Sequence, residues 1–210
     1  MPDLRLELDL YRQGYRLVAG ADEAGRGPLA GPVVVGVVVL PAQNSPARWL
    51  ERVRDSKQMT PLQREVAFAE IQRHALGVST GEATAHEIDG LGLTGAVHLA
   101  LTRALQSLPL RPDYLLVDFM HALPEGLPCR ALVDGDDSCY SIAAASIVAK
   151  VTRDRWMEAA DRCFPGYGFA EHKGYATPAH LEALRCLGPC PIHRRSFSPL
   201  RQPLLWPGGD

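Results

Sequence analysis

The stretch Val18–Gly36, VAGADEAGRGPLAGPVVVG, decides the fold, because an apolar run stops in it at two carboxylates and resumes after a glycine-spaced turn. A strand-like segment ends in Asp22 and Glu23. The glycine turn at residues 25–28 interrupts the strand pattern, which resumes in a β-branched run at residues 33–39. Buried carboxylates are costly unless they are hydrated, paired or bound to a cation. The stretch therefore predicts two strands with an acidic site beside the turn that joins them.

The two neighbouring acids impose a geometric demand on the first strand. Adjacent residues on a regular strand point to opposite faces of the sheet. Asp22 and Glu23 can therefore face one site only if the strand ends at Asp22, and the glycines in the turn favour such an ending. In a second interpretation, Arg26 only neutralises one of the acids in an ordinary turn.

Length and composition predict one domain. The chain has 210 residues, of which 46% are hydrophobic, so it can build one well-filled core. We expect a single domain over residues 1–200 and a flexible tail over residues 201–210. The net charge of −2 does not indicate a nucleic-acid binder, so such a role needs a local basic patch.

The location predicted from the sequence is the cytoplasm. The start of the chain lacks the pattern of a signal peptide, and no run reaches the roughly 20 apolar residues of a membrane span. The five cysteines lack Cys-x-x-Cys spacing, which is typical of a reducing compartment. Cys186, Cys190 and His193 are the most metal-like group, but we interpret them as ordinary side chains of a proline-rich extended loop.

The remaining pattern predicts an α/β fold in which a central sheet is flanked by helices. Strands are expected at residues 17–22, 32–40, 76–84, 113–118 and 129–133. Helices are expected at residues 47–53, 62–75, 94–108, 140–163 and 178–187. Thr60 and Pro61 have the residue types that begin a helix, as N-cap and first helical residue.

Four carboxylates lie at or just beyond the ends of predicted strands: Asp22, Glu23, Asp118 and Asp136. Binding sites in α/β sheets gather at such ends. Clustered carboxylates repel one another, and hard divalent cations with oxygen ligands, Mg²⁺ or Mn²⁺, relieve that repulsion. Two such ions about 4 Å apart activate water and stabilise the leaving oxygen of a phosphodiester. The acids therefore predict a site for one or two divalent cations, which is a kind of site that can hydrolyse a phosphodiester.

Basic and aromatic side chains gather in the second half of the chain. Lysine and arginine hold phosphates, and a tyrosine ring stacks on a base or sugar, so the mixture suits nucleic acid. A solvated helix face explains Arg153 and Arg155 equally well, and Tyr175 alone is more typical of a core or lid residue. The residues in question are Lys150, Arg153, Arg155, Tyr167, Phe169, His172, Lys173, Tyr175, Arg194 and Arg195.

Seven ordered motifs between residues 17 and 200 closely resemble those of bacterial ribonuclease HII, the type 2 ribonuclease H family. Their order and spacing together are far more specific than any one of them. The motifs are DEAGRGP at 22–28, DSK at 55–57, LVD at 116–118, GD at 135–136, SIAAASIVAKVTRD at 141–154, HKGY at 172–175 and PIHRRSF at 191–197.

The resemblance implies a ribonuclease H fold with a mixed sheet, and a nuclease that cuts the RNA strand of RNA–DNA hybrids. It also implies cutting on the 5′ side of single ribonucleotides embedded in duplex DNA, which leaves 3′-hydroxyl and 5′-phosphate ends. We expect a monomer whose partners are these nucleic acids, with no membrane partner.

The resemblance also implies roles for individual residues. Tyr175 is expected to test the sugar at the RNA-to-DNA junction, and the turn formed by Gly25, Arg26 and Gly27 to recognise the 2′-hydroxyl and a nearby phosphate. The catalytic, metal-binding residues are then Asp22, Glu23, Asp118 and Asp136. The residues expected to hold backbone phosphates are Lys57, Ser146, Lys150, Arg153 and Lys173.

The sequence departs from the family pattern in three places. Phe119 stands where glycine usually follows the third carboxylate, which reshapes the lip of the site. Asp134 stands where lysine is common, so Asp134, Asp136 and Asp137 are all candidates for the fourth acid, and we favour Asp136 because it follows a glycine. The chain also ends soon after the PIHRRSF motif, without the longer tail of some relatives, which predicts weaker substrate binding.

Two other functions are weaker interpretations. The G-x-G-x-x-G match at residues 90–95 suggests a dinucleotide-binding turn, but AHEID at residues 85–89 precedes it instead of an apolar strand. A non-catalytic hybrid-binding protein would have lost at least one of the four acids, and all four are present.

Overall fold

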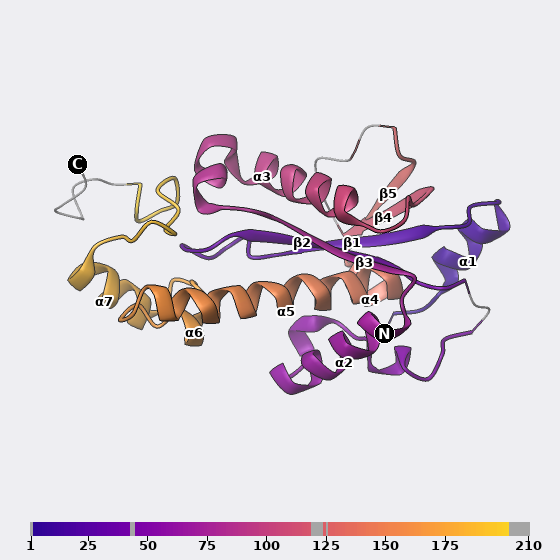
Figure 1. The fold of residues 1–210 in the computed structure, drawn as a ribbon, viewed down its shortest axis with the longest axis horizontal. Helices are drawn as coiled ribbons and strands as arrows, with labels where there is room; N and C mark the ends of the chain where they lie inside the picture. Colours follow the sequence, from indigo (N-terminus) through magenta and orange to yellow (C-terminus); the bar gives the residue numbers. More distant parts are fainter. Residues whose placement is uncertain (1, 43–44, 119–123, 125, 202–210) are drawn as a thin grey trace.

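The computed structural model describes residues 2–42, 45–118, 124 and 126–201. A five-stranded sheet with the strand order β3-β2-β1-β4-β5 lies at its centre (Figure 1). The first three strands pair antiparallel, and β4 and β5 join them in parallel, which confirms the predicted mixed sheet. The strands are β1 (Val18–Ala24), β2 (Val33–Val39), β3 (Gly77–Ala83), β4 (Tyr114–Asp118) and β5 (Cys129–Leu132).

Helices cover both faces of the sheet. Figure 1 shows α3 on one face and the long α5 on the other, with α2 packed outside α5. In the described part of the chain, no helix combines the length and the apolar character needed to cross a membrane. The helices are α1 (Arg5–Arg12), α2 (Pro61–His74), α3 (Ala85–Ser107), α4 (Gly135–Ser138), α5 (Tyr140–Cys163), α6 (Phe169–His172) and α7 (Pro178–Leu187), with short 3₁₀ turns η1 (Leu50–Arg52) and η2 (Ser56–Gln58).

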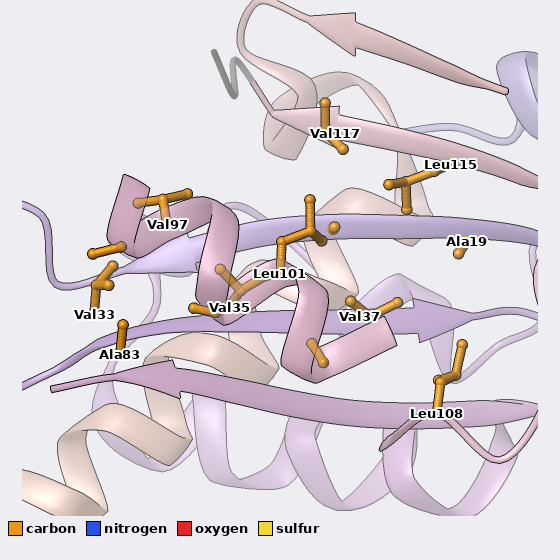
Figure 2. Packing of buried hydrophobic residues seen from close by; sticks show 14 of the residues in the cluster. Ala19, Val33, Val35, Val37, Ala83, Val97, Leu101, Leu108, Leu115 and Val117 are labelled. Atoms are coloured by element: carbon orange, nitrogen blue, oxygen red, sulfur yellow. The ribbon is translucent and has the colours of Figure 1, made fainter. Parts of the chain in front are cut away.

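The core between α3 and the sheet follows from strand alternation. Val33, Val35 and Val37 of β2 share one face, and Val97 and Leu101 of α3 pack over them (Figure 2). All these side chains are buried, and apolar burial is the main force that stabilises a fold of this kind.

The other face holds α5 at an unusually short distance because glycines line β1 and β2 there. A Cβ atom added at Gly20 would lie 2.1 Å from the carbonyl carbon of Ser141, and one added at Gly36 would lie 2.5 Å from the carbonyl oxygen of Ala145. The small residues of α5 thus let its backbone rest directly on the sheet. This contact sets the position of Ser146 beside the acidic end of β1.

Helix starts were predicted with mixed success. Thr60 and Pro61 begin α2 as predicted, and the Thr60 side chain accepts a hydrogen bond from the backbone of Gln63. The helix predicted at residues 47–53 is wrong, because only the 3₁₀ turn Leu50–Arg52 forms there.

The helix predicted from residue 94 is confirmed as the later part of α3, and an earlier part that was not predicted begins at Ala85 and precedes a break at Gly92. Thr84 caps it, since its hydroxyl accepts from the backbone of Glu87, while the Glu87 carboxylate accepts from the backbone N–H of Thr84. The chain then bends inside α3 at Gly92, which has a φ of 71°. The dinucleotide-binding interpretation is therefore wrong, because its glycines lie inside α3 and not in a turn that follows a strand.

The predicted end of the first strand at Asp22 is also wrong. β1 continues in register with β2, so that Glu23 pairs with Val35 and Ala24 with Val34. Although neighbouring residues alternate along a regular strand, both acids line one hollow, so the strand does not have to end at Asp22 for them to share a site. The prediction about Phe119, and the prediction of a flexible tail at residues 201–210 beyond residue 201, concern residues outside those the structure describes.

Candidate active site

Three carboxylates from three segments meet on the α5 face of the sheet. Because β1 and β4 run parallel with Ala21 beside Val117, the residues that follow these two, Asp22 and Asp118, lie next to each other. Asp136, from α4, completes the group, and each of the three acids offers an oxygen within 4.8 Å of the others. Among the described residues no other group of three or more His, Cys, Asp or Glu side chains converges in this way.

The α4 turn carries Asp136 into the group. The backbone N–H of Gly135 donates to Oδ1 of Asp118 at 2.8 Å, which ties α4 to the end of β4. The turn begins at Asp134, whose φ of 52° lies in the left-handed region, and it buries Asp136. Asp134 and Asp137, the other candidates for the fourth acid, are outside the group of three.

Glu23 lines the same hollow but stands apart from the three converging acids. The hollow has a volume of about 370 Å³, and both Asp22 and Glu23 contribute to its wall. Oε1 of Glu23 accepts from Nη1 of Arg26 at 2.8 Å, so the ion pair of the second interpretation is present. Oε2 is buried and has no hydrogen-bond partner within the described part of the protein.

Burial and mutual repulsion make these acids hard to ionise. Burial raises the pKa of Asp22 well above its ordinary value, the charge of Glu23 adds to the rise, and a hydrogen bond from Ser146 opposes it. Burial also raises the pKa of Asp118, with a further contribution from Asp136. The Glu23 pKa is raised by burial too, although Arg26 offsets part of the effect.

A hard divalent cation fits this donor set. Every ligand atom is a carboxylate oxygen, which Mg²⁺ and Mn²⁺ prefer, and a bound cation would favour the ionised form of each acid. The buried, unpartnered Oε2 of Glu23 supplies a further oxygen at the wall of the same hollow. Asp22, Asp118 and Asp136 would hold the cation, with Glu23 adjoining them.

The raised pKa values predict how pH and Mg²⁺ change stability. An acid with a raised pKa in the folded state disfavours folding once it ionises, so the free energy of unfolding should fall as pH rises above the ordinary values of 3.8 and 4.5 through the raised ones. Adding Mg²⁺ at pH 8 should reverse the loss, by about 2.7 kcal/mol at a hundredfold excess over its dissociation constant.

Urea unfolding of the metal-free protein at pH 5 and pH 8, with and without MgCl₂, measures both effects. NaCl at matched ionic strength is the control for screening. If the free energy of unfolding at pH 8 is the same in MgCl₂ as in NaCl of matched ionic strength, the acids do not bind Mg²⁺.

Two buried arginines shape the turn after β1. Arg194 donates from three nitrogens to the carbonyl oxygens of Gly25, Arg26 and Gly31, at 2.6, 3.0 and 3.0 Å. Arg153 donates to two further carbonyls, those of Pro32 and Ala30, at 3.0 and 3.1 Å. The turn therefore owes its shape to guanidinium groups from distant parts of the chain.

The two arginines differ from their predicted use. The sequence placed Arg153 among the phosphate contacts and Arg194 in a basic cluster suited to nucleic acid. Both side chains are buried, with exposed fractions of 1% and 0%, and burial lowers the pKa of Arg194 to about 9. Their guanidinium groups donate hydrogen bonds to backbone carbonyls, and in this way they hold the turn in place.

The other residues expected at the site fall into two adjoining hollows. The first hollow brings together most of them: Asp22, Glu23, Gly25, Arg26, Gly27, Lys57, Asp118, Ser146, Lys150, Arg153 and Tyr175. Lys173 lies in the second hollow, of about 360 Å³, which shares Lys150 and Tyr175 with the first. Tyr175 is 45% exposed and stands at the boundary of both.

The lysines differ in how strongly the protein engages them. Nζ of Lys57 lies 3.2 Å from Asp136, and its side chain is 76% exposed. Nζ of Lys150 is 2.7 Å from Asp154. Lys173 is the most restrained, because its amine donates both to Glu158 and to the Ala170 carbonyl.

Sequence reasoning missed Arg64, which lines both hollows from α2. Its guanidinium donates to the carbonyls of Ser56 and Met59, and so holds the segment that carries Lys57. The Ser56 hydroxyl is in turn 2.9 Å from that of Ser146. An arginine inside an ordinary helical pattern gave no signal of this role.

Comparison with known proteins agrees with the geometry. The family model for ribonuclease HII matches residues 19–199. The ribonuclease HII of Chloroflexus aurantiacus is 52% identical over 206 residues, covering 98% of this chain and 97% of that protein. The ribonuclease HII of Geobacillus kaustophilus is 49% identical, covering 96% of this chain and 75% of that protein.

A solved structure leads to the same family. The crystal structure of ribonuclease H2 from Pyrococcus horikoshii OT3 superposes with a TM-score of 0.72 at 32% identity, covering 88% of this chain and 95% of that one. The fold is therefore the ribonuclease H-like fold that the sequence predicts. The chain belongs to the ribonuclease HII family, whose members are metal-dependent endoribonucleases that act on RNA–DNA hybrids.

Proposed function

We propose that this protein cuts the RNA strand of RNA–DNA hybrids and also cuts duplex DNA on the 5′ side of a single embedded ribonucleotide. The products carry 3′-hydroxyl and 5′-phosphate ends, and the reaction uses two Mg²⁺ or Mn²⁺ ions. One observation carries the proposal: acids suited to a divalent cation share a hollow with a glycine turn and a half-exposed tyrosine, Tyr175.

The acids have the catalytic role in this proposal. Asp22, Asp118 and Asp136 would bind the cations, and Glu23 lines the same hollow as Asp22 and Asp118. When bound, the two cations supply an activated water and stabilisation of the leaving oxygen. The protein's part is to hold the acids on rigid elements, two adjacent strands and the turn before α5, so that little reorganisation is needed during the reaction.

The turn at residues 25–27 is suited to reading a sugar. Its carbonyls at Gly25 and Arg26 already accept from Arg194, so in this proposal the N–H groups of the turn contact the ligand. Backbone N–H groups in a turn bind hydroxyl and phosphate oxygens well. Tyr175 borders the turn, since its Cε1 lies 3.8 Å from where a Cβ of Gly27 would be. A ribose between them would present its 2′-hydroxyl to the turn and a face to the ring.

Lys57 and Lys150 are the phosphate contacts that this arrangement favours. Both line the hollow of the acids, and Lys57 is largely exposed. Ser146 donates a hydrogen bond to Asp22 and so favours the ionised form of that acid. We assign Arg153 to holding the turn, because its guanidinium is buried against backbone carbonyls.

The position and chemistry of the cut test the proposal. An end-labelled DNA duplex with one ribonucleotide is incubated with the protein and Mg²⁺, and the products are sized to a single nucleotide. We expect one nick immediately 5′ of the ribonucleotide that DNA ligase can seal, since sealing needs a 3′-hydroxyl and a 5′-phosphate. A nick on the 3′ side, or a 2′,3′-cyclic phosphate end, would overturn the proposal.

Gly27→Ala should separate substrate recognition from folding. A methyl group here meets only the Tyr175 ring, at 3.8 Å, so the free energy of unfolding should change by no more than about 0.5 kcal/mol. The methyl nevertheless stands where the sugar would approach the backbone, so kcat/KM should fall by about 10- to 100-fold.

Single-ribonucleotide cleavage and urea unfolding, run in parallel, measure the two effects. Gly90→Ala is the matched control, because a Cβ at Gly90 meets nothing within 4 Å and the residue lies in α3, away from the hollow. Cleavage by Gly27→Ala at the rate of that control would contradict a close backbone approach.

A further inference from the structure

Two buried histidines lie next to Tyr175, outside the group of acids. His180 and His193 are 0% and 2% exposed, and their Nε2 atoms are 3.0 Å apart. His193 was the histidine of the metal-like group in the sequence, but Cys186 of that group is exposed and bonds Glu182. Among the described residues neither histidine belongs to a converging group of three metal ligands, so the pair calls for another explanation.

Fixed partners at the two ends of the pair determine where its protons lie. Nδ1 of His180 is 2.8 Å from the carbonyl oxygen of Tyr175, which can only accept, so this nitrogen carries a proton. Nδ1 of His193 is 3.0 Å from the backbone N–H of Cys190, which can only donate, so this nitrogen is bare. With both rings neutral, Nε2 of His193 donates to Nε2 of His180.

The reverse order of protons would require a charged ring. The carbonyl oxygen of Cys190 is 3.3 Å from Nδ1 of His193. If Nδ1 donated to this oxygen, the neutral His193 ring would carry its proton on Nδ1 and Nε2 would be bare. Nε2 of His180 would then have to donate while Nδ1 still donates to Tyr175, which makes His180 a cation. Burial opposes that, since it lowers the pKa of His180 and lowers that of His193 to about 4.

The hydrogen bonds form a directed chain from the 190–193 turn to the backbone of Tyr175. We call this chain the histidine relay: Cys190 N–H to His193, His193 to His180, and His180 to the Tyr175 carbonyl. His180 is itself fixed in the first turn of α7, where its backbone N–H donates to the Thr177 hydroxyl. The relay thus connects Tyr175 to two rigid parts of the fold.

The segment before Tyr175 needs such an anchor. Lys173 and Gly174 both have positive φ, 52° and 83°, so the chain turns sharply just before the ring. His172 stacks on His180 at 4.4 Å and accepts from the N–H of Gly174. The carbonyl of Gly174 accepts from the backbone N–H of Leu29, beyond the glycine turn, and this bond, which is not part of the relay, ties the segment before Tyr175 to that turn.

We propose that His180 and His193 are positioning residues for Tyr175, which hold its ring at the RNA-to-DNA junction through the histidine relay. The inference rests on the proposed function, because it assumes that Tyr175 reads the junction. Both histidines are buried and act through the Tyr175 carbonyl, which also accepts from the backbone N–H of Thr177, so their effects should depend on the presence of the tyrosine ring.

Two substitutions at His180 separate the effect of its hydrogen bond to the Tyr175 carbonyl from the effect of side-chain size. In His180→Asn the amide can still donate where Nδ1 was, whereas in His180→Gln the amide reaches only towards His193. We expect His180→Gln to lower kcat/KM on a duplex with one ribonucleotide about tenfold, and His180→Asn to stay within about threefold of wild type. Equal losses in the two variants would overturn the proposal.

A double-mutant cycle with Tyr175→Ala tests whether the effect passes through the ring. In the Tyr175→Ala background, His180→Gln should change kcat/KM by less than about twofold, because the two changes remove one interaction. A purely structural role for His180 would give the same tenfold loss in both backgrounds, and that result would contradict the proposal.

The wild-type protein provides a test that needs neither a variant nor activity. The ¹⁵N NMR shifts of the ring nitrogens at pH 7 should show protons on Nδ1 of His180 and on Nε2 of His193. A proton on Nε2 of His180 would overturn the relay. If wild-type protein fails to cut the duplex, the proposed function fails and the junction role falls with it, while these shifts still decide the relay.

Discussion

An Asp118→Asn variant is expected to lose at least about a thousandfold in cleavage rate, because several kcal/mol of metal-derived stabilisation depend on this carboxylate. A neutral amide oxygen is a weaker ligand for a hard cation than a carboxylate oxygen is. The fold should survive, since the Asn oxygen can still accept the 2.8 Å hydrogen bond from Gly135 that ties α4 to β4.

The same substitution should make the metal-free protein more stable at neutral pH. Burial and the charge of Asp136 raise the pKa of Asp118, so its ionised form opposes folding above the ordinary value of 3.8. Removing the charge removes that opposition. Activity and stability therefore move in opposite directions, which distinguishes loss of a ligand from simple damage to the fold.

Single-turnover cleavage and urea unfolding without metal measure the two effects. Asp134→Asn is the matched control, because Asp134 is exposed, lies outside the three-acid group and has a φ of 52° that asparagine tolerates. The control should cut at the wild-type rate. Near-normal turnover by Asp118→Asn would refute its role as a ligand.

The second large effect is expected for Arg194→Lys, which should lower the free energy of unfolding by about 3 kcal/mol. The guanidinium of Arg194 serves three carbonyls at once, from Gly25, Arg26 and Gly31. A lysine ammonium is a single point on a flexible stem and cannot reproduce that planar fork. Buried carbonyls left without a donor account for the loss.

The variant should also lose activity beyond what unfolding explains. At a temperature where Arg194→Lys is fully folded, the looser turn should lower kcat/KM about a hundredfold, because small displacements at a reacting site are costly. Arg195→Lys is the control, since Arg195 is exposed and engages Asp89 through its backbone N–H. If the two variants unfold and cut alike, Arg194 does not hold the turn.

The sequence predicted most of the sheet because its signals are local. The acids at the ends of β1 and β4 follow apolar runs, and a parallel pairing of those strands is enough to place Asp22 beside Asp118. The fourth acid, Asp136, was favoured from its place after a glycine, and the structure does bring it to the other two.

What the sequence could not show depends on pairing and on long-range contacts. Glycines at 25 and 27 suggested that β1 ends at Asp22, but pairing with β2 continues to Ala24, and Glu23 lines the hollow without joining the three-acid group. Whether a strand continues depends on its partner, which the local pattern does not reveal.

Buried arginines mislead for a related reason. Arg194 donates a hydrogen bond to the carbonyl of Gly25, 169 residues away in the sequence. Its positive charge alone suggested a contact with nucleic acid. The start of α3, by contrast, did carry a local signal: Thr84 and Glu87 have the spacing of a capping box, which indicates a helix from Ala85.

The three converging acids are expected to drive metal-dependent cutting at a ribonucleotide. The most direct test of this expectation is cleavage of a duplex with one embedded ribonucleotide, with binding of the same duplex measured alongside. We expect a nick by the wild type with Mg²⁺ or Mn²⁺, no nick after chelation, and no nick by Asp118→Asn although the variant still binds. A wild-type protein that binds the duplex and leaves it uncut with either cation would contradict it.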